Sequence, residues 1–131
     1  MSATVTESAT PLIECRGLSA GYGPLAAIRE VDLHVMPGEV VALIGRNGAG
    51  KSSTLLALSG ALSPMQGEVR WNGAITTAPL HTRCKAGLSY LTEERSIIMN
   101  MSAADNLRLG GVASSDAVAL FPELEPLLKR T

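Results

Sequence analysis

Eight consecutive residues, Gly45 to Ser52, place glycines, a lysine and a hydroxyl at a fixed spacing. They read Gly-Arg-Asn-Gly-Ala-Gly-Lys-Ser and fit G-x-x-x-x-G-K-[ST], the phosphate-binding loop. Its glycines allow the backbone N–H groups to converge on one anion, and a helix beginning near Gly50 adds a positive dipole end. Lys51 is suited to the β- and γ-phosphates, and the Ser52 hydroxyl to Mg²⁺. The pattern predicts a binding site for a nucleoside triphosphate.

The residues on either side of this loop fit the same interpretation. Val40 to Ile44 is a continuous apolar run, which is typical of a strand buried on both faces. Leu55, Leu58 and Leu62 follow at helical spacing. The alternative is a chance glycine-rich turn with a lysine on the next helix. Four fixed positions between a strand and a helix favour the phosphate loop.

The rest of the chain alternates strands and turns early and becomes helical late. Strands are predicted at 13–17, 31–35, 68–71 and 87–91, with turns at 36–39 and 72–73 and a loop at 63–67. Helices are predicted at 79–85, from Ser102 through Leu109, and at 116–130 with interruptions at Pro122 and Pro126. This order predicts an α/β protein.

Composition narrows the class further. The 131 residues suffice for one domain, with 46% hydrophobic and 18% charged residues. A net charge of −1 without a basic stripe argues against a nucleic-acid partner, and no apolar run is long enough for a membrane span. Met1 to Thr10 lacks the pattern of a signal peptide, and we expect residues 1–10 to form a disordered tail. Cys15 and Cys84 show neither metal-ligand spacing nor a disulfide framework.

Four further stretches, with the loop, resemble the ATP-binding cassette (ABC) ATPases. Leu18 to Gly23 resembles the A-loop of that family, and Pro37-Gly38-Glu39 resembles the turn that enters its Walker strand. Gly67-Glu68-Val69 with Asn72-Gly73 resembles the stretch after its first helix, and Leu88 to Arg95 followed by 102–107 resembles its Q-loop region. The resemblance runs from about Leu12 to Arg130. It implies a P-loop NTPase core of ABC type with an antiparallel β subdomain and the start of a helical subdomain.

The resemblance also implies a set of site residues. Tyr22 would stack on adenine, although alone it is equally well an ordinary half-buried turn tyrosine. Glu93 would join Ser52 in reaching Mg²⁺ or its water, with a solvated carboxylate as the alternative. The implied ligands are ATP and Mg²⁺. The implied nucleotide-binding residues are Tyr22, Gly45, Arg46, Asn47, Gly48, Ala49, Gly50, Lys51, Ser52 and Ser53.

One position favours a subfamily. The family usually has Gln where this chain has Glu93, and a Glu followed by an Arg and an x-Asn-Leu helix is similar to the ATPases of branched-chain amino acid, amide and urea importers. Those proteins usually carry a proline where Thr92 stands here. They also often have Phe-Pro near the position of Met99-Asn100, so the chain departs from the subfamily pattern at two places.

Three elements of the family do not occur in the sequence. They are the Leu-Ser-Gly-Gly-Gln signature, a Walker B strand ending in Asp and Glu, and a switch histidine, and no catalytic residue is identifiable. We therefore expect residues 11–131 to be the N-terminal portion of a nucleotide-binding domain, truncated before the signature, with its C-terminal half absent. An isolated chain of this kind should fold marginally or aggregate.

The implied function is the ATP-binding subunit, as a fragment, of an importer. Its implied partners are transmembrane permease subunits and a second ATP-binding subunit, which places it in the cytoplasm, peripheral on the inner face of the cell membrane. A non-hydrolysing nucleotide-binding module and a non-functional truncated product remain alternatives. A P-loop kinase or GTPase is disfavoured, since 106–109 reads Asn-Leu-Arg-Leu and not Asn-Lys-x-Asp.

Overall fold

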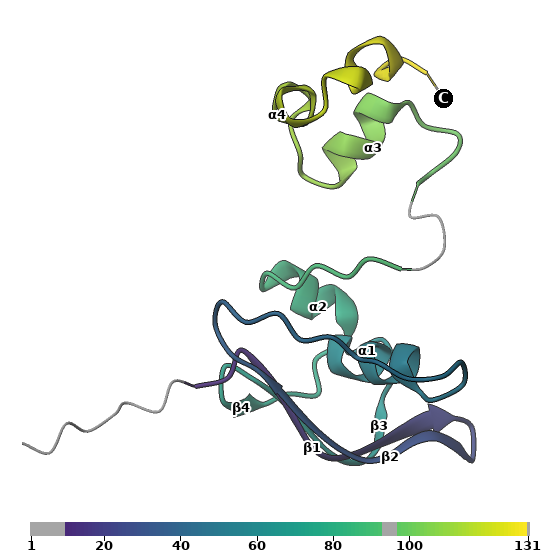
Figure 1. Ribbon diagram of the computed structural model, residues 1–131, viewed down its shortest axis with the longest axis vertical. Coiled ribbons are helices and arrows are strands. Elements are labelled where there is room, and N and C mark those ends of the chain that lie inside the picture. The colour runs from purple at the N-terminus through teal and green to yellow at the C-terminus, as the bar shows by residue number, and fades with distance from the viewer. Residues whose placement is uncertain (1–9, 93–96, 131) are drawn as a thin grey trace, which may run out of the picture. The chain divides into compact units, whose positions relative to one another are not determined.

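The computed structural model describes residues 10–92 and 97–130. The chain divides into two compact units, Met1–Tyr90 and Leu91–Thr131, which are drawn in Figure 1. The first unit carries the sheet and the predicted phosphate loop. The second consists of short helices, as the late part of the sequence predicts.

The sheet of the first unit is antiparallel and has the strand order β2-β1-β3-β4. Its strands are β1 (Ile13–Tyr22), β2 (Leu25–Val35), β3 (Pro64–Trp71) and β4 (Ala74–Ile75). Both predicted turns are confirmed. Gly38 has φ 75° and the Glu39 N–H donates to the Met36 carbonyl at 3.1 Å, as in a type II turn. Asn72 and Gly73 both have positive φ and join β3 to β4 as a two-residue hairpin loop.

Helix α1 (Lys51–Ser59) packs on the sheet and closes the core (Figure 1). The helix contributes Ala57 and Leu58, and the strands contribute the residues whose side chains point to the same face. The core residues are Cys15, Leu18, Ala20, Ile28, Ala57, Leu58 and Val69. Because α1 begins at Lys51, this packing fixes the helix that follows the phosphate loop.

The remaining helices are short. Helix α2 (Leu80–Lys85) lies in the first unit, and α3 (Ala103–Leu109), α4 (Ser114–Leu120) and the 3₁₀ helix η1 (Pro122–Leu127) form the second. The Ser102 hydroxyl accepts from the Asp105 N–H at 3.1 Å, which confirms the predicted N-cap. Within the described residues we find no helix with the length and apolar character needed to cross a membrane.

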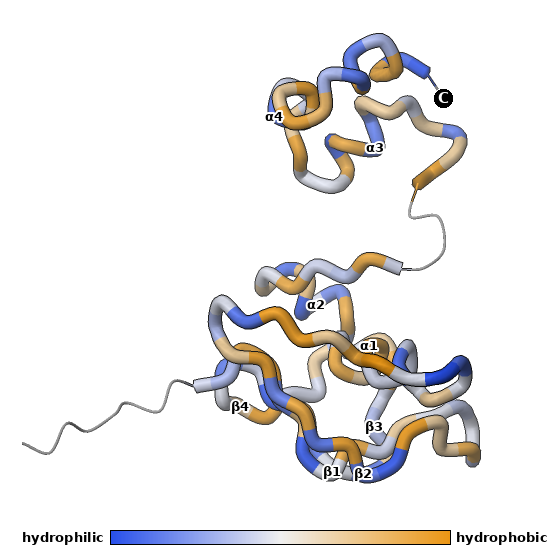
Figure 2. The backbone as a smooth tube through the Cα atoms, viewed as in Figure 1, coloured by the Kyte–Doolittle hydropathy of each residue, from blue (hydrophilic) through white to orange (hydrophobic). Residues whose placement is uncertain are grey.

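Two predicted strands are wrong. Val40 to Ile44 is not a strand, and Val40 and Ile44 are 95% and 94% exposed although the stretch is the apolar run visible in Figure 2. Residues 87–91 are likewise not a strand. A parallel strand needs neighbours that accept and donate its backbone hydrogen bonds, and the four described strands pair only with one another. Residues 64–67, predicted as loop, belong to β3.

Candidate nucleotide-phosphate site

The predicted phosphate loop is a tight turn that leads directly into α1. The Ala49 N–H donates to the Arg46 carbonyl at 3.1 Å, which places Asn47 and Gly48 at the tip. Gly48 has φ 83°, and a Cβ built on it would meet no heavy atom within 4 Å. The tip is therefore open, as a loop that receives a ligand on its backbone must be.

Lys51 is held across the start of this loop. Its Nζ donates to the Gly45 carbonyl at 2.8 Å and to the Arg46 carbonyl at 2.9 Å. An ammonium group has three donors, so these two bonds fix its position and leave one N–H for a ligand. The structure thus sets a positive charge beside the backbone of the loop, where a phosphate would need it.

Gly50 joins the loop to α1 and packs against β2. Its φ is 87°, and a Cβ there would lie 2.4 Å from Ile28 Cγ2 and 3.0 Å from the Ala27 carbonyl oxygen. Only glycine fits both the backbone conformation and the space. The Gly50 carbonyl accepts from the Thr54 N–H at 2.8 Å and from the buried Thr54 hydroxyl at 2.9 Å, so the first turn of α1 is well ordered.

The N-terminus of α1 suits an anion. Among the described residues no side chain caps this helix, and no acidic residue lies in its first turn. The N–H groups of a first turn have no intrahelical partner, and they carry the positive end of the helix dipole. A phosphate on the loop would supply both a hydrogen-bond acceptor and the complementary charge. Ser52 and Ser53 lie in this same turn.

Tyr22 lies at the end of β1, where it pairs with Leu25 across the hairpin turn, and it is 58% exposed. Ile28, which meets Gly50, is three residues further along β2. At 3.3 Å per residue this is about 10 Å of strand. The exposed ring is therefore carried by the same strand pair against which the loop packs. This placement is compatible with the adenine contact that the family resemblance implies, which stays a prediction.

The predicted metal ligands are only partly covered by the structure. Ser52 is exposed in the first turn of α1, whereas Glu93 lies outside the described residues. Within the residues described, no group of three or more His, Cys, Asp or Glu side chains is placed to hold a metal ion.

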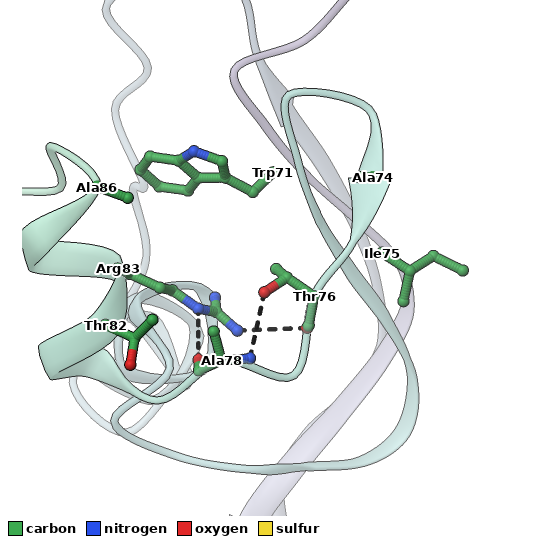
Figure 3. A pocket seen from close by; sticks show the side chains of 8 residues that line it. All are labelled: Trp71, Ala74, Ile75, Thr76, Ala78, Thr82, Arg83 and Ala86. Carbon is green, nitrogen blue, oxygen red and sulfur yellow. Dashed lines mark hydrogen bonds between the residues drawn. The ribbon is translucent and has the colours of Figure 1, made fainter.

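Two residues with dense polar contacts were missed at the sequence level. Arg83 on α2 is 4% exposed, and its guanidinium donates to three main-chain carbonyls of the described residues. With Trp71 it lines a cavity of about 260 Å³ beside β4, where Figure 3 shows both side chains. Asn106 on α3 bonds the backbone of Ile98, Met101 and Ser102. Neither residue was marked by the sequence reasoning. Arg83 bonds a carbonyl as far as 25 positions away, whereas Asn106 bonds main-chain groups four to eight positions before it.

Comparison with known proteins agrees with this geometry. Residues 28–130 match the family described as ABC transporter. This chain belongs to the ABC transporter ATP-binding family. It is 37% identical over 122 residues to the ribose import ATP-binding protein RbsA 2 of Escherichia coli O157:H7, covering 89% of this chain and 23% of that protein. It is 32% identical over 123 residues to a probable branched-chain amino acid transport ATP-binding protein, LivF, of Archaeoglobus fulgidus, covering 86% and 52%.

Solved structures place the ABC chain in the same fold. A structure titled as the ATP binding subunit of an ABC transporter superposes with a TM-score of 0.69 at 30% identity, covering 90% of this chain and 53% of that one. A nucleotide-free ATP-binding cassette superposes with a TM-score of 0.72 at 19% identity, which supports the fold alone. The ABC ATPase fold with its antiparallel sheet is thereby confirmed. The chain spans 23% to 40% of the length of the first three curated relatives.

Proposed function

We propose that this chain binds Mg-ATP at residues 45–53 as part of the ATP-binding subunit of an ABC importer. The observation that carries the proposal is the Lys51 ammonium fixed on the Gly45 and Arg46 carbonyls at the N-terminus of α1. A fixed positive charge beside a helix start that carries no acidic residue in its first turn is suited to a triphosphate. Tyr22 is proposed as the adenine contact, and Ser52 with Glu93 as the protein ligands of Mg²⁺.

We propose a broad class for the transported solute and, within it, a narrower one. Relatives named for ribose, fructose and branched-chain amino acid transport support an importer of small polar nutrients. Glu93 at the Q-loop position favours branched-chain amino acids or related amides within that class, whereas Thr92 does not follow the subfamily pattern. A lipopolysaccharide export relative from Acidithiobacillus ferridurans is 39% identical over 97 residues, so sequence similarity alone does not choose among them.

The proposed partners follow from the same family. Transmembrane permease subunits would hold the chain on the inner face of the cell membrane, and a second ATP-binding subunit would complete the nucleotide site. Hydrolysis is proposed only together with residues that the longer relatives carry, because no residue in this sequence was identified to position the attacking water. The activity proposed for the chain itself is nucleotide binding.

Binding of a fluorescent ATP analogue such as mant-ATP, with and without Mg²⁺, tests the proposal directly. Wild type should bind and Lys51→Ala should lose at least tenfold in affinity, because charge-assisted hydrogen bonds contribute about 1.5–3 kcal/mol. Lys129→Ala is the matched control, since Lys129 follows η1 in the other unit and lies outside the loop. Equal affinity of Lys51→Ala and wild type would refute the phosphate site.

Phosphate release from unlabelled ATP separates the alternatives. Binding without release supports a non-hydrolysing module in the absence of partners. Release that Lys51→Ala abolishes would show that the chain hydrolyses ATP without a signature motif of its own. A wild-type chain that folds but binds neither ATP nor its analogue would favour the non-functional product.

A further inference from the structure

Arg83 is a buried cation whose partners among the described residues are main-chain carbonyls. Its Nη1 donates to the Leu58 carbonyl at 2.5 Å, its Nε to the Ala78 carbonyl at 2.7 Å and its Nη2 to the Thr76 carbonyl at 3.4 Å. The ion pairs found among the described residues do not include it. Burial lowers the pKa of Arg83, but an arginine stays charged in proteins. The positive charge of Arg83 is therefore stabilised by the dipoles of main-chain carbonyls.

One of these dipoles belongs to the helix that starts at the phosphate loop. Leu58 lies in the last turn of α1, where carbonyls lack intrahelical partners and the helix dipole is negative. The last turn of α1 contains no basic residue of its own. Arg83, from α2, supplies the positive charge that this helix end lacks. The N-terminal end of α1 therefore carries Lys51 and the phosphate loop, and its C-terminal end is bound by Arg83 of α2.

A glycine lies at the junction between the C-terminal end of α1 and the start of α2. Gly60 ends α1 with φ 82°, and a Cβ there would lie 2.6 Å from the Ala78 carbonyl oxygen and 2.8 Å from Arg83 Nε. The Gly60 carbonyl also accepts from the Leu80 N–H, the first residue of α2, at 3.1 Å. The C-terminal end of α1 and the start of α2 therefore meet through both side-chain and main-chain bonds, with no room for a larger residue.

We propose that Arg83 is a positioning residue for nucleotide binding, which anchors the far end of α1 and so holds Lys51 in place. The proposal rests on the proposed ATP site. Helix α1 has nine residues and is about 13 Å long, so it moves as one short rod. Its loop end is seated on β2 by Gly50, and its other end by Arg83. Loss of the second anchor allows the helix to tilt and its last turn to fray.

The test compares Arg83→Met, Arg83→Lys and the control Arg70→Met, using mant-ATP affinity corrected for the folded fraction. Arg70 pairs with Glu68 on β3 at 2.6 Å, so its loss removes a charge-assisted bond away from α1. We expect Arg83→Met to weaken binding about three- to tenfold, which lies within the range of about two- to thirtyfold for residues that couple to a site without touching the ligand. Arg83→Lys should recover part of that loss, and Arg70→Met should bind like wild type.

The outcomes distinguish the two proposals. One outcome is that Arg83→Met lowers the stability of the chain and yet leaves the affinity of the folded fraction at the wild-type value. In that case Arg83 has a structural role alone, and the positioning role is overturned. If Arg83→Met does not fold, the affinity of Arg83→Lys tests the positioning role. The single nitrogen of a lysine cannot reproduce the guanidinium fork, so wild-type affinity in Arg83→Lys would also overturn the proposal. A wild type that does not bind the analogue refutes the ATP site and the positioning role together, whereas a variant that matches wild type refutes only the latter.

Discussion

Replacing Gly50 by alanine should destabilise the chain through two separate effects. A residue with a Cβ at φ 87° loses about 1–2 kcal/mol. The added methyl would also lie 2.4 Å from Cγ2 of Ile28, which is 5% exposed and held in the core, and such overpacking costs about 1–3 kcal/mol. Reduced freedom of the unfolded chain offsets about 0.4–1 kcal/mol. The expected net loss is about 2–4 kcal/mol, a large share of a typical total of about 5–15 kcal/mol.

Gly48→Ala is the matched control. Gly48 has nearly the same φ, 83°, but a Cβ there meets nothing within 4 Å, so only the conformational part applies and the expected loss is about 1 kcal/mol. Urea unfolding followed by the fluorescence of Trp71, the single tryptophan of the chain, measures both variants. Equal losses in the two would show that Gly50 is not packed against β2, and the account of how α1 is seated would be wrong.

Three further outcomes follow from individual contacts. In Asn106→Ala, the Ile98 amide, which now donates to Asn106 Oδ1 at 2.8 Å, should exchange with deuterium about fivefold faster by NMR, since one hydrogen bond contributes about 1 kcal/mol; the neighbouring Asn100→Ala should change nothing. A thiol reagent should modify Cys84, which is exposed, at once, and Cys15, which is buried, only on unfolding; equal rates would contradict the core. Burial raises the pKa of Cys15, so its thiol stabilises the fold fully below the unfolded pKa of about 8.5 and this contribution is lost as pH rises through the folded pKa. The urea midpoint should therefore fall at alkaline pH, and fall less in Cys15→Ala.

Features set by neighbours in the chain could be predicted from the sequence. The turn at Met36–Glu39, the Asn72-Gly73 hairpin and the Ser102 cap each depend on residues at most three positions apart, and all three are confirmed. The backbone of the phosphate loop also depends on close neighbours. Its Lys51 contacts lie five and six residues away, and Gly48 and Gly50 have positive φ. The nucleotide site itself stays a prediction.

Features that depend on distant partners could not be predicted in this way. The run from Val40 to Ile44 has the composition of a buried strand, but composition does not supply the strands beside which it must lie. Arg83 is the opposite case, because a surface-type residue in a short helix becomes buried through carbonyls as far as 25 positions away. In both cases the outcome depends on which segments meet in space.

These two cases together explain how the candidate site is built. A phosphate loop is normally held between a strand on one side and a helix on the other. Here residues 40–44 are not a strand and are largely exposed, and the contacts found among the described residues hold the loop from its helix side. Gly50 against Ile28, Thr54 under the first turn and Arg83 at the last turn are the contacts that do so. Because all three act on α1, the geometry of Lys51 depends on how firmly that one helix is anchored. Substitutions that loosen the junction between α1 and α2 should therefore lower the affinity of the chain for nucleotide. Substitutions in the exposed residues 40–44 should change that affinity less.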